Sequence, residues 1–495
     1  MMEKVNAIIF SIFKLRRNEG RKFLIMAFLM FCILLNQNIL RNIKDSWVVT
    51  VIGAEIITFI KLWIEVPAGA VFLFFYSRLC NKINLFWVFR IIILLFLFYL
   101  TIFLFILIPY IENIQPSQKI VDQIILFAPY TKWFLIIISK WVIVSFYVIG
   151  ELWPIIFYCI LFWQLANSIT SSEQAQRFYP ALGFFGQSNL IFSSIIITYF
   201  TSDKFFLQKY FSIHNLHEET NSRIKCLLFL SIVLCIISLL LHILIEKDLK
   251  KNPTVYSISK DKFLPLKLGF RESIKLVISS KYLLSVSLIV VSYSLSINLL
   301  EGILLSKISQ YYKGVTKDVM NYNALITLYI GCFTLFFNFF GNRVITKFGW
   351  LVSSILTPIS TLVFGSLFFI STIFSEYLVN NKSYILLISI IIGGIHIVIT
   401  KSIKYSFFDS SKEMAYLTMN NELKVKGKGA IEIFGTKIGK ASGSLIQNIL
   451  FIVFPYSTYD DIKILLFIMF VVVMMVWIRS VITINFYYKK SKINK

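Results

Sequence analysis

The chain contains a series of apolar stretches, each long enough to cross a lipid bilayer as a helix. A spanning helix needs about 20 predominantly apolar residues, and we identify twelve such stretches: 22–45, 52–76, 86–110, 132–165, 180–200, 225–246, 276–301, 321–342, 349–373, 383–403, 430–455 and 463–487. Composition agrees, because 57% of the 495 residues are hydrophobic and only 15% are charged. The sequence therefore predicts an all-α polytopic membrane protein. It excludes a soluble enzyme, a soluble nucleic-acid binder and a disordered chain.

A charged segment near the middle of the chain separates the stretches into two groups of six. We expect an N-terminal half at 1–246, a cytoplasmic central loop at 247–275 and a C-terminal half at 276–495. Lys and Arg are concentrated in both termini, in this loop and in alternate loops, whereas the loops at 111–131 and 374–382 hold few. Cytoplasmic loops carry the excess of Lys and Arg, so both termini should be cytoplasmic. Many secondary transporters have two such halves and bind substrate between them, near the middle of the membrane.

Cysteine and histidine give no sign of a metal or redox site. The six Cys and four His residues are scattered, without a CxxC pair or another metal-ligand spacing. No ATPase module is recognisable either. We therefore expect no cofactor and no metal, and transport driven by gradients or by exchange.

Polar residues crowd the end of the first stretch, where a charge at the bilayer centre would cost about 2.5–3.5 kcal/mol on insertion scales. At 3.6 residues per turn, Asn38, Arg41 and Asp45 share one face of a helix. Lys44 lies on a neighbouring stripe. The density of polar groups favours the lining of a cavity. The alternative is an ordinary helix end whose cations reach the membrane surface.

Two carboxylates lie within or at the end of other stretches. Glu151 is deep in 132–165, and Pro154 should kink that span near it, because proline removes a backbone hydrogen bond. Glu301 ends the seventh stretch and is followed by Lys307. An ionisable residue inside the membrane is by default a candidate for function. The alternatives are a structural ion pair for Glu151 and an exposed loop position for Glu301.

Lysines and glycines are interspersed in 424–443, which leads into the eleventh stretch. A phosphate-binding P-loop is excluded. The glycines of this segment stand closer together than those of the P-loop motif, and Ala441 stands where that motif requires Ser or Thr. The spacing instead predicts a small-residue stripe for close helix contact, formed by Gly435, Gly439 and Gly443. A parallel polar stripe consists of Glu432, Thr436 and Lys440. The alternative is a basic helix start whose lysines reach the membrane surface.

A basic segment with aromatic residues, 401–409, precedes this region and contains Lys404. Trp47, Trp153 and Phe408 are candidates for stacking on a nucleobase. An excess of cations directed into the membrane region suits a polyanionic substrate. Lys supplies point charges, and Arg supplies a planar fork that matches phosphate oxygens.

These segments resemble the ATP:ADP translocases of obligate intracellular bacteria and plastids, the non-mitochondrial nucleotide transporters. The resemblance covers nearly the whole chain through FCILLNQNILRNIKD (31–45), ELWPIIFYCILFWQLAN (151–167), QRFYPALG (176–183), SINLLEG (296–302), KYSFFDSSKEMAY (404–416) and KVKGKGAIEIFGTKIGKASGSLIQ (424–447). It implies twelve spans in a major-facilitator-like fold, a location in the cell inner membrane and import of host nucleotide. The typical reaction is ATP exchanged for ADP, with phosphate in some members and other ribonucleotides in others.

Transport in this family depends on four charged residues, which the resemblance assigns by motif. The Lys after the first span corresponds to Lys44, the Glu of the E-L-W motif to Glu151 and the Glu of the N-L-x-E-G motif to Glu301. The fourth, a Lys in the segment that opens span eleven, corresponds to Lys426 or Lys440.

The chain departs from the ATP/ADP exchangers at three places. Leu304 and Leu305 replace an aromatic residue and a Lys, and Ala441 interrupts a motif that usually reads G-K-S-G-G. Pro154 follows the E-L-W motif, where those exchangers commonly have Gly. The E-L-W-P form is more similar to paralogues that carry other nucleotides.

We therefore predict a secondary transporter, not an enzyme, that carries nucleoside di- or triphosphates by ATP/ADP-type exchange or imports another ribonucleotide. Its expected partners are the nucleotide, phosphate and the lipid bilayer, with no nucleic acid. The predicted substrate-binding residues are Lys44, Glu151, Glu301, Lys426, Lys440, Arg41, Asn38, Trp153, Lys307 and Lys404. The two glutamates would hold the lysines until phosphate arrives. The alternatives are a carrier of another phosphorylated or organic anion, and a membrane-embedded enzyme that acts on lipid-linked phosphate.

Overall fold

The computed structural model describes residues 19–202, 216–251, 278, 280–375, 382–417, 431 and 435–493. Regular structure in these ranges is entirely helical, without a strand. Eleven helices are long and apolar enough to cross a membrane, and Ile438–Val453 is a shorter apolar helix. The prediction of an all-α polytopic fold is confirmed.

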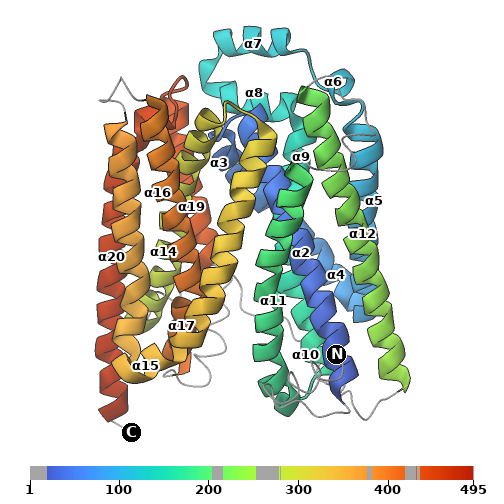
Figure 1. Ribbon diagram of the computed structural model, residues 1–495, viewed down its shortest axis with the longest axis vertical. Helices are drawn as coiled ribbons and strands as arrows, with labels where there is room; N and C mark the ends of the chain where they lie inside the picture. Colours follow the sequence, from blue (N-terminus) through green and yellow to red (C-terminus); the bar gives the residue numbers. More distant parts are fainter. Residues whose placement is uncertain are drawn as a thin grey trace.

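The helices of the first half form one bundle (Figure 1). They are α2 (Gly20–Val51), α3 (Ile56–Ile60), η2 (Lys61–Glu65), α4 (Val66–Lys82), α5 (Leu85–Ile102), η3 (Phe103–Leu107), α9 (Trp141–Trp153), η5 (Pro154–Phe162), α10 (Trp163–Ile169), α11 (Ser172–Thr201) and α12 (Leu216–Lys251). Four short helices lie across one end of the molecule: α6 (Ile111–Ile114), α7 (Gln118–Phe127), η4 (Pro129–Thr131) and α8 (Lys132–Ser139).

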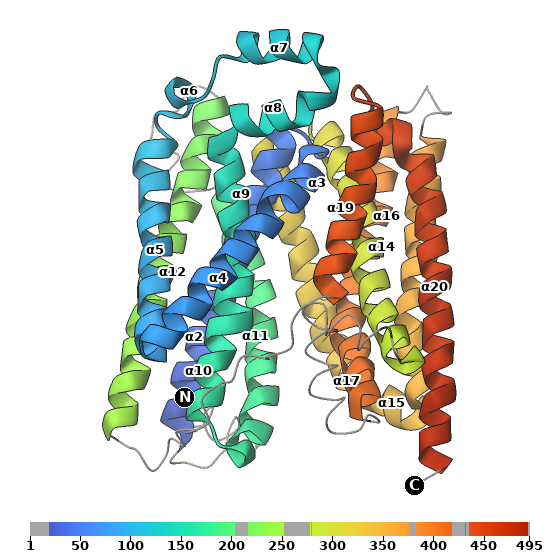
Figure 2. The ribbon, with the colours of Figure 1, turned by 180° about the vertical axis from the view of Figure 1, so that it is seen from behind.

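The helices of the second half form the other bundle (Figure 2). They are α14 (Lys281–Tyr311), α15 (Thr316–Phe374), α16 (Lys382–Ile403), η8 (Lys404–Phe408), α17 (Asp409–Leu417), α19 (Thr436–Val453) and α20 (Tyr459–Ile493). α15 contains two spans that meet at Gly349, whose φ of 81° breaks the helix. A side chain would disfavour this left-handed backbone, so the turn between the spans requires glycine.

The fourth predicted stretch is wrong in its boundary, and the helix changes form at Pro154. α8 ends at Ser139, Lys140 leaves the helical conformation, and α9 begins at Trp141, so the membrane-crossing part starts later than expected. Pro154 does not break the helix; the backbone continues as the π-helical segment η5. Insertion of a π-helical segment provides another way to accommodate a residue that lacks its N–H.

Three π-helical segments lie within the spans that carry charged residues. η2 begins at Lys61 and ends at Glu65, η5 follows three residues after Glu151, and η8 begins at Lys404. π-helical turns are rare and occur frequently at functional sites, because they redirect side chains that a regular helix would place elsewhere.

The beginning of α2 and the end of α20 lie at the same end of the molecule (Figure 1). We call it the N/C end, and we call the opposite end the α7 end. The two bundles approach each other at the α7 end and diverge toward the N/C end in both views (Figures 1 and 2).

Candidate functional site

A cavity of about 210 Å³ lies between the two bundles. The first bundle lines it with α2, η5 and α11, and the second with α14, α15, α16 and η8. Its charged side chains are Arg41, Asp45, Glu301 and Lys401. Its neutral polar side chains include Gln37, Asn38, Gln187, Asn189 and Asn323. A polar cavity between two helical halves is the arrangement in which secondary transporters hold their substrates.

Lys44 is held inside the first bundle by two carboxylates. Its Nζ lies 2.7 Å from Glu151 Oε1 and 2.5 Å from Asp45 Oδ1. The same ammonium lies 4.0 Å from the centre of the Tyr147 ring. α2 and α9 approach so closely here that a Cβ on Gly150 would lie 2.8 Å from Lys44 Cδ. Two anions and an aromatic face thus compensate a cation whose side chain is only 2% exposed.

Glu301 on α14 is shared by three cations. Its Oε1 lies 3.3 Å from Arg41 Nη2 and 3.8 Å from Lys401 Nζ, and its Oε2 lies 3.5 Å from Lys61 Nζ. Arg41 and Lys61 belong to the first bundle, so the carboxylate joins both halves. The Arg41 side chain is 45% exposed, and its Nε is 3.6 Å from Asp45. Since these contacts are long, the three cations retain hydrogen-bonding capacity for another anion.

Lys440 on α19 connects the two groups electrostatically. Its ammonium interacts with the carboxylates of Glu151, Glu65 and Glu301. Its side chain is exposed, and it forms no direct ion pair with the described residues. We call the whole set the central charge cluster: Arg41, Lys44, Lys61, Lys401, Lys440, Asp45, Glu65, Glu151 and Glu301. Within the described ranges, no group of His, Cys, Asp and Glu is arranged to hold a metal ion.

Two further predicted residues lie close to the cluster. Asn38 lines the cavity and lies on α2 about one turn before Arg41. It donates a hydrogen bond to the Asn189 side chain on α11. Lys404 pairs with Asp409 at 3.0 Å, at the start of η8.

Lys307 lies away from the cavity, toward the α7 end. Its side chain is 5% exposed, and its Nζ lies 2.5 Å from Asp460 Oδ1 at the start of α20. Lys307 does not line the cavity, and neither do Lys44, Glu151 and Lys440. Unlike those three, Lys307 does not belong to the central charge cluster. The structure therefore places Lys307 in an ion pair within the second bundle rather than at the proposed substrate position.

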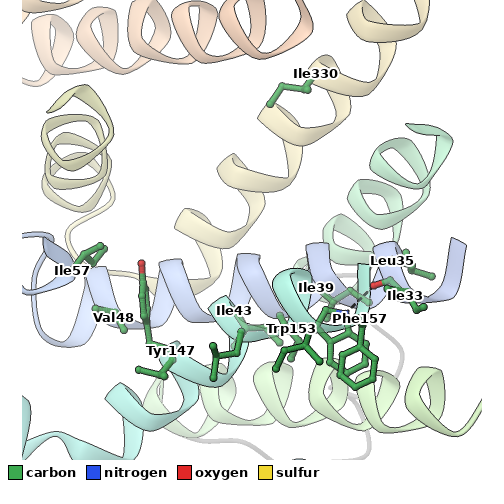
Figure 3. Packing of buried hydrophobic residues seen from close by; sticks show 14 of the residues in the cluster. Ile33, Leu35, Ile39, Ile43, Val48, Ile57, Tyr147, Trp153, Phe157 and Ile330 are labelled. Carbon is green, nitrogen blue, oxygen red and sulfur yellow. Dashed lines mark hydrogen bonds between the residues drawn. The ribbon is translucent and has the colours of Figure 1, made fainter. Parts of the chain in front are cut away.

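The three aromatic residues expected to stack on a base lie in the core instead. Trp153 is fully buried, its Nε1 donates a hydrogen bond to the Ile33 carbonyl at 3.0 Å, and its ring packs on Phe157 (Figure 3). Trp47 and Phe408 are also buried among other aromatic rings. Residues two apart on a helix point to different faces, so Trp153 does not follow Glu151 toward the charges.

The segment that opens span eleven is described only in part. Lys426 and Glu432 lie outside the described residues, so of the two lysines assigned to the fourth family position only Lys440 can be located.

The glycine stripe on α19 is confirmed as a close-contact surface. A Cβ added to Gly439 would lie 2.6 Å from the backbone oxygen of Val291 on α14. One added to Gly443 would lie 2.7 Å from Asn298 Oδ1. This close packing keeps α19, and therefore Lys440, against the helix that carries Glu301.

Sequence reasoning missed Lys61 and Glu65, and it included Lys401 only as the first residue of the basic segment 401–409. Lys61 and Glu65 lie in the second stretch, four residues apart, and Lys401 lies at the end of the tenth. Two signals in the sequence could have found them. Charged residues inside an apolar span are costly to insert, which is how Glu151 was identified. Charged side chains four residues apart also share one helix face.

Contacts between the bundles close the α7 end. They include Thr50 Oγ1 to Thr316 Oγ1 (2.8 Å), Lys132 Nζ to the Pro455 carbonyl (3.1 Å), the Tyr459 N–H to Glu55 Oε1 (3.3 Å) and Asn448 Nδ2 to the Thr58 carbonyl (3.4 Å). Burial raises the pKa of the Glu55 carboxyl and lowers the pKa of the Lys132 ammonium. Burial at this end therefore disfavours the charged form of both side chains.

Among the described residues, two ion pairs toward the N/C end lie within one bundle. Arg177 pairs with Glu19 at 2.9 Å in the first bundle, and Lys404 pairs with Asp409 in the second. The bundles diverge here (Figure 2). The contacts between the bundles therefore close the cavity toward the α7 end.

The sequence matches one family along most of its length. The family described as "TLC ATP/ADP transporter" matches residues 1–488. The chain is 37% identical over 494 residues to "ADP,ATP carrier protein 3" of Rickettsia prowazekii (strain Madrid E), covering 99% of this chain and 98% of that protein. It is 35% identical over 487 residues to "ADP,ATP carrier protein 1" of the same organism, covering 96% of this chain and 94% of that protein.

Solved structures resemble the chain in fold alone. A bacterial homologue of the iron transporter ferroportin, in its inward-facing state, aligns with a TM-score of 0.55 at 11% identity, over 95% of this chain and 98% of that one. The nucleoside transporter NupG aligns with a TM-score of 0.54 at 12% identity, over 92% of this chain and 99% of that one. The two-bundle fold is thus that of major-facilitator-like transporters.

Proposed function

The chain belongs to the TLC ATP/ADP transporter family, and from this membership and its central charge cluster we propose that it exchanges ATP for ADP across a membrane. It is a transporter and not an enzyme. The observation that carries the proposal is the sharing of Glu301 by Arg41, Lys61 and Lys401. A carboxylate held by three cations from two halves is a resident anion that a phosphate group can replace.

Binding would replace one set of ion pairs by another. Without substrate, Glu301 and Glu151 neutralise the cations, because unpaired charges inside the membrane are costly. A nucleotide phosphate offers more oxygens and more charge, so Arg41 and the lysines turn toward it. Lys440, which makes no direct pair with a described residue, is available to the phosphate from the start.

This substitution would couple binding to movement of the two halves. The contacts of Glu301 with Arg41 and Lys61 cross from the second bundle to the first. Substrate that takes over these cations changes the relative stability of the two access states. A ligand can shift a conformational equilibrium only through such differential contacts.

We propose that the N/C end faces the cytoplasm of a bacterial cell and that the protein resides in the inner membrane. Lys and Arg enrichment in both termini and the central loop at 247–275 supports this orientation. The halves at 1–246 and 276–495 then rock about the cavity. With this orientation, the end at which the bundles diverge would face the cytoplasm.

Phosphate is a second proposed substrate, since the same cations suit it. Departures at Leu304, Leu305 and Pro154 from the usual exchanger motifs favour a base other than adenine as an additional or alternative cargo. A carrier of another phosphorylated anion is the competing proposal. Competition between radiolabelled ATP and a panel of unlabelled nucleotides, phosphate and sugar phosphates separates these three possibilities.

The proposal is tested by uptake of radiolabelled ATP into intact bacterial cells that express the chain. We expect saturable uptake that unlabelled ADP inhibits, and a loss of at least about tenfold in Lys44→Ala, because Glu151 and Asp45 lose their cation. Lys250→Ala, which removes an exposed lysine outside the cavity, is the matched control. Normal uptake by a correctly inserted Lys44→Ala protein would refute the role of this lysine.

A further inference from the structure

Two tyrosines face the cavity from opposite halves. Tyr158 on η5 belongs to the first bundle and Tyr405 on η8 to the second, and both line the cavity. Both side chains are half-buried, and they lie close enough to interact electrostatically. Their rings are thus on the wall that a ligand would touch, unlike those of Trp47, Trp153 and Phe408.

The two tyrosines occupy corresponding elements of the two halves. η5 lies in the fourth membrane-crossing helix and η8 lies in the tenth, and both segments are π-helical. A π-helical turn changes the direction of the side chains that follow it. The same local device therefore presents one aromatic ring from each side of the cavity.

The tyrosines lie beside the phosphate-binding cations, on the side of the N/C end. Tyr405 is four residues, or about 6 Å, beyond Lys401, and Tyr158 is seven residues, or about 10 Å, beyond Glu151. Tyr405 also lies within electrostatic range of Arg41. The Lys404 ammonium lies 4.5 Å from the centre of the Tyr405 ring, which holds that ring from one side.

Neutral polar side chains complete this part of the cavity. Asn38 is engaged with Asn189, whereas Gln187 makes no hydrogen bond with a described residue. The cavity thus offers a matching group for each part of a nucleotide. The central charge cluster suits the phosphates, the two tyrosine rings suit the face of the base, and the Gln187 amide suits the edge of the base.

We propose that Tyr158 and Tyr405 form an aromatic clamp that holds the nucleobase between the two halves. The inference rests on the proposed function, because it assumes that the cargo is a nucleotide whose phosphates reach the central charge cluster. Every base has a flat aromatic face, so stacking supplies affinity without selecting one base strongly. The two rings belong to different halves, so stacking of both on one base would draw the halves together. The base, as well as the phosphates, would then stabilise an occluded state.

The test uses purified protein in liposomes preloaded with ADP, with uptake of radiolabelled ATP as the readout. The variants are Tyr158→Leu and Tyr405→Leu, which remove a ring, and Tyr158→Phe and Tyr405→Phe, which keep it. The competitor is inorganic triphosphate, which carries the phosphates without a base. Base stacking on an aromatic side chain commonly contributes about tenfold or more in affinity.

We expect each Leu variant to raise the KM for ATP about tenfold and to leave the inhibition constant of inorganic triphosphate unchanged. Each Phe variant should keep both values near those of the unmodified protein. Equal losses for ATP and triphosphate would overturn the clamp, because they would report a general disturbance of the site. Equal losses in the Phe and Leu variants would also overturn it, since the hydroxyl rather than the ring would then matter.

The clamp and the proposed function fail in different ways. If the unmodified protein exchanges no nucleotide, the proposed function is wrong and the clamp falls with it. If the unmodified protein exchanges ATP and both Leu variants keep its KM, the clamp alone is wrong.

Discussion

At the scale of single residues, Glu301 is the side chain whose surroundings say most about transport. It lies between cations of both bundles, and none of its contacts is shorter than 3.3 Å. A structural ion pair inside a membrane would be expected to have closer geometry, because only good geometry offsets desolvation. The loose arrangement suits a carboxylate that exchanges places with substrate.

Glu301→Gln should separate binding from transport. Removal of the competing charge leaves Arg41, Lys61 and Lys401 free for phosphate, so nucleotide binding should become several-fold tighter. Exchange should slow by at least about tenfold, which corresponds to about 1.4 kcal/mol. The reason is that a neutral Gln cannot take the cations back from the phosphates when substrate leaves. Equilibrium binding of labelled ATP in detergent and exchange in liposomes measure the two effects. Weaker binding would show that Glu301 contacts the substrate directly.

Part of the central charge cluster was predictable from the sequence. Arg41, Lys44, Glu151 and Glu301 stand out in the sequence, because each interrupts or ends an apolar run. Their pairing was not predictable, since it depends on which helices face each other. Trp153 was misplaced for a related reason: sequence distance from Glu151 does not show which helix face points to the cavity.

At the scale of helices, glycine determines how closely α19 approaches α14. The backbone oxygen of Val291 occupies the place that a Cβ on Gly439 would need. Backbone cannot move aside as a flexible side chain can. Lys440 is the next residue along the helix, so its position depends on this contact.

Gly439→Ala should therefore lower thermal stability, by about 1–3 kcal/mol as overpacking commonly does, and reduce exchange by displacing Lys440. Gly183→Ala is the matched control, because it makes the same change inside α11, where an added Cβ meets nothing within 4 Å. Ala favours a helix over Gly, so the control should be neutral or slightly stabilising. Melting temperatures in detergent measure both. Equal stability of the two variants would contradict the close packing.

The sequence predicted the glycine contact but not the π-helical segments. Three-residue spacing of small residues has a direct geometric meaning on a helix. A π-helical turn leaves no comparable pattern, because it arises from how the surrounding helices hold the backbone. Pro154 indicated a kink, but the π-helical segment η5 that begins at this residue was not predicted.

At the scale of the whole molecule, contacts between the bundles close the α7 end, and the bundles diverge toward the N/C end (Figure 1). Glu55 takes part in the closure by accepting a hydrogen bond from the Tyr459 N–H. Burial raises the pKa of this carboxyl above its ordinary value of 4.5. The closed state thus binds a proton more tightly than a state in which Glu55 meets water.

Acidification toward the ordinary pKa of Glu55 should therefore favour closure of the α7 end. Glu55→Gln removes the charge while keeping an acceptor for the Tyr459 N–H, so it should increase the closed population at neutral pH and weaken the pH dependence. Spin labels at Tyr130→Cys and Tyr456→Cys, in a background without native cysteines, report the distance across this end. A Gln variant with a larger open population would contradict the prediction.

Of the whole-molecule features, the all-helical membrane-spanning fold was predictable. It follows from long apolar stretches, whose length depends on the thickness of the bilayer rather than on packing. Which end of the molecule is closed was not predictable, because a state closed at either end contains the same membrane-spanning helices. It is visible only through contacts such as Lys132 with Pro455.

The central claim is that the charge cluster performs nucleotide exchange, and one measurement tests it most directly. Purified protein is placed in liposomes that contain ADP, phosphate or buffer alone, and uptake of radiolabelled ATP is followed. We predict rapid uptake into ADP-loaded liposomes, at least about tenfold slower uptake into unloaded ones, and loss of the difference in Glu301→Gln. Uptake that is absent, or equally fast with and without internal nucleotide, would contradict exchange.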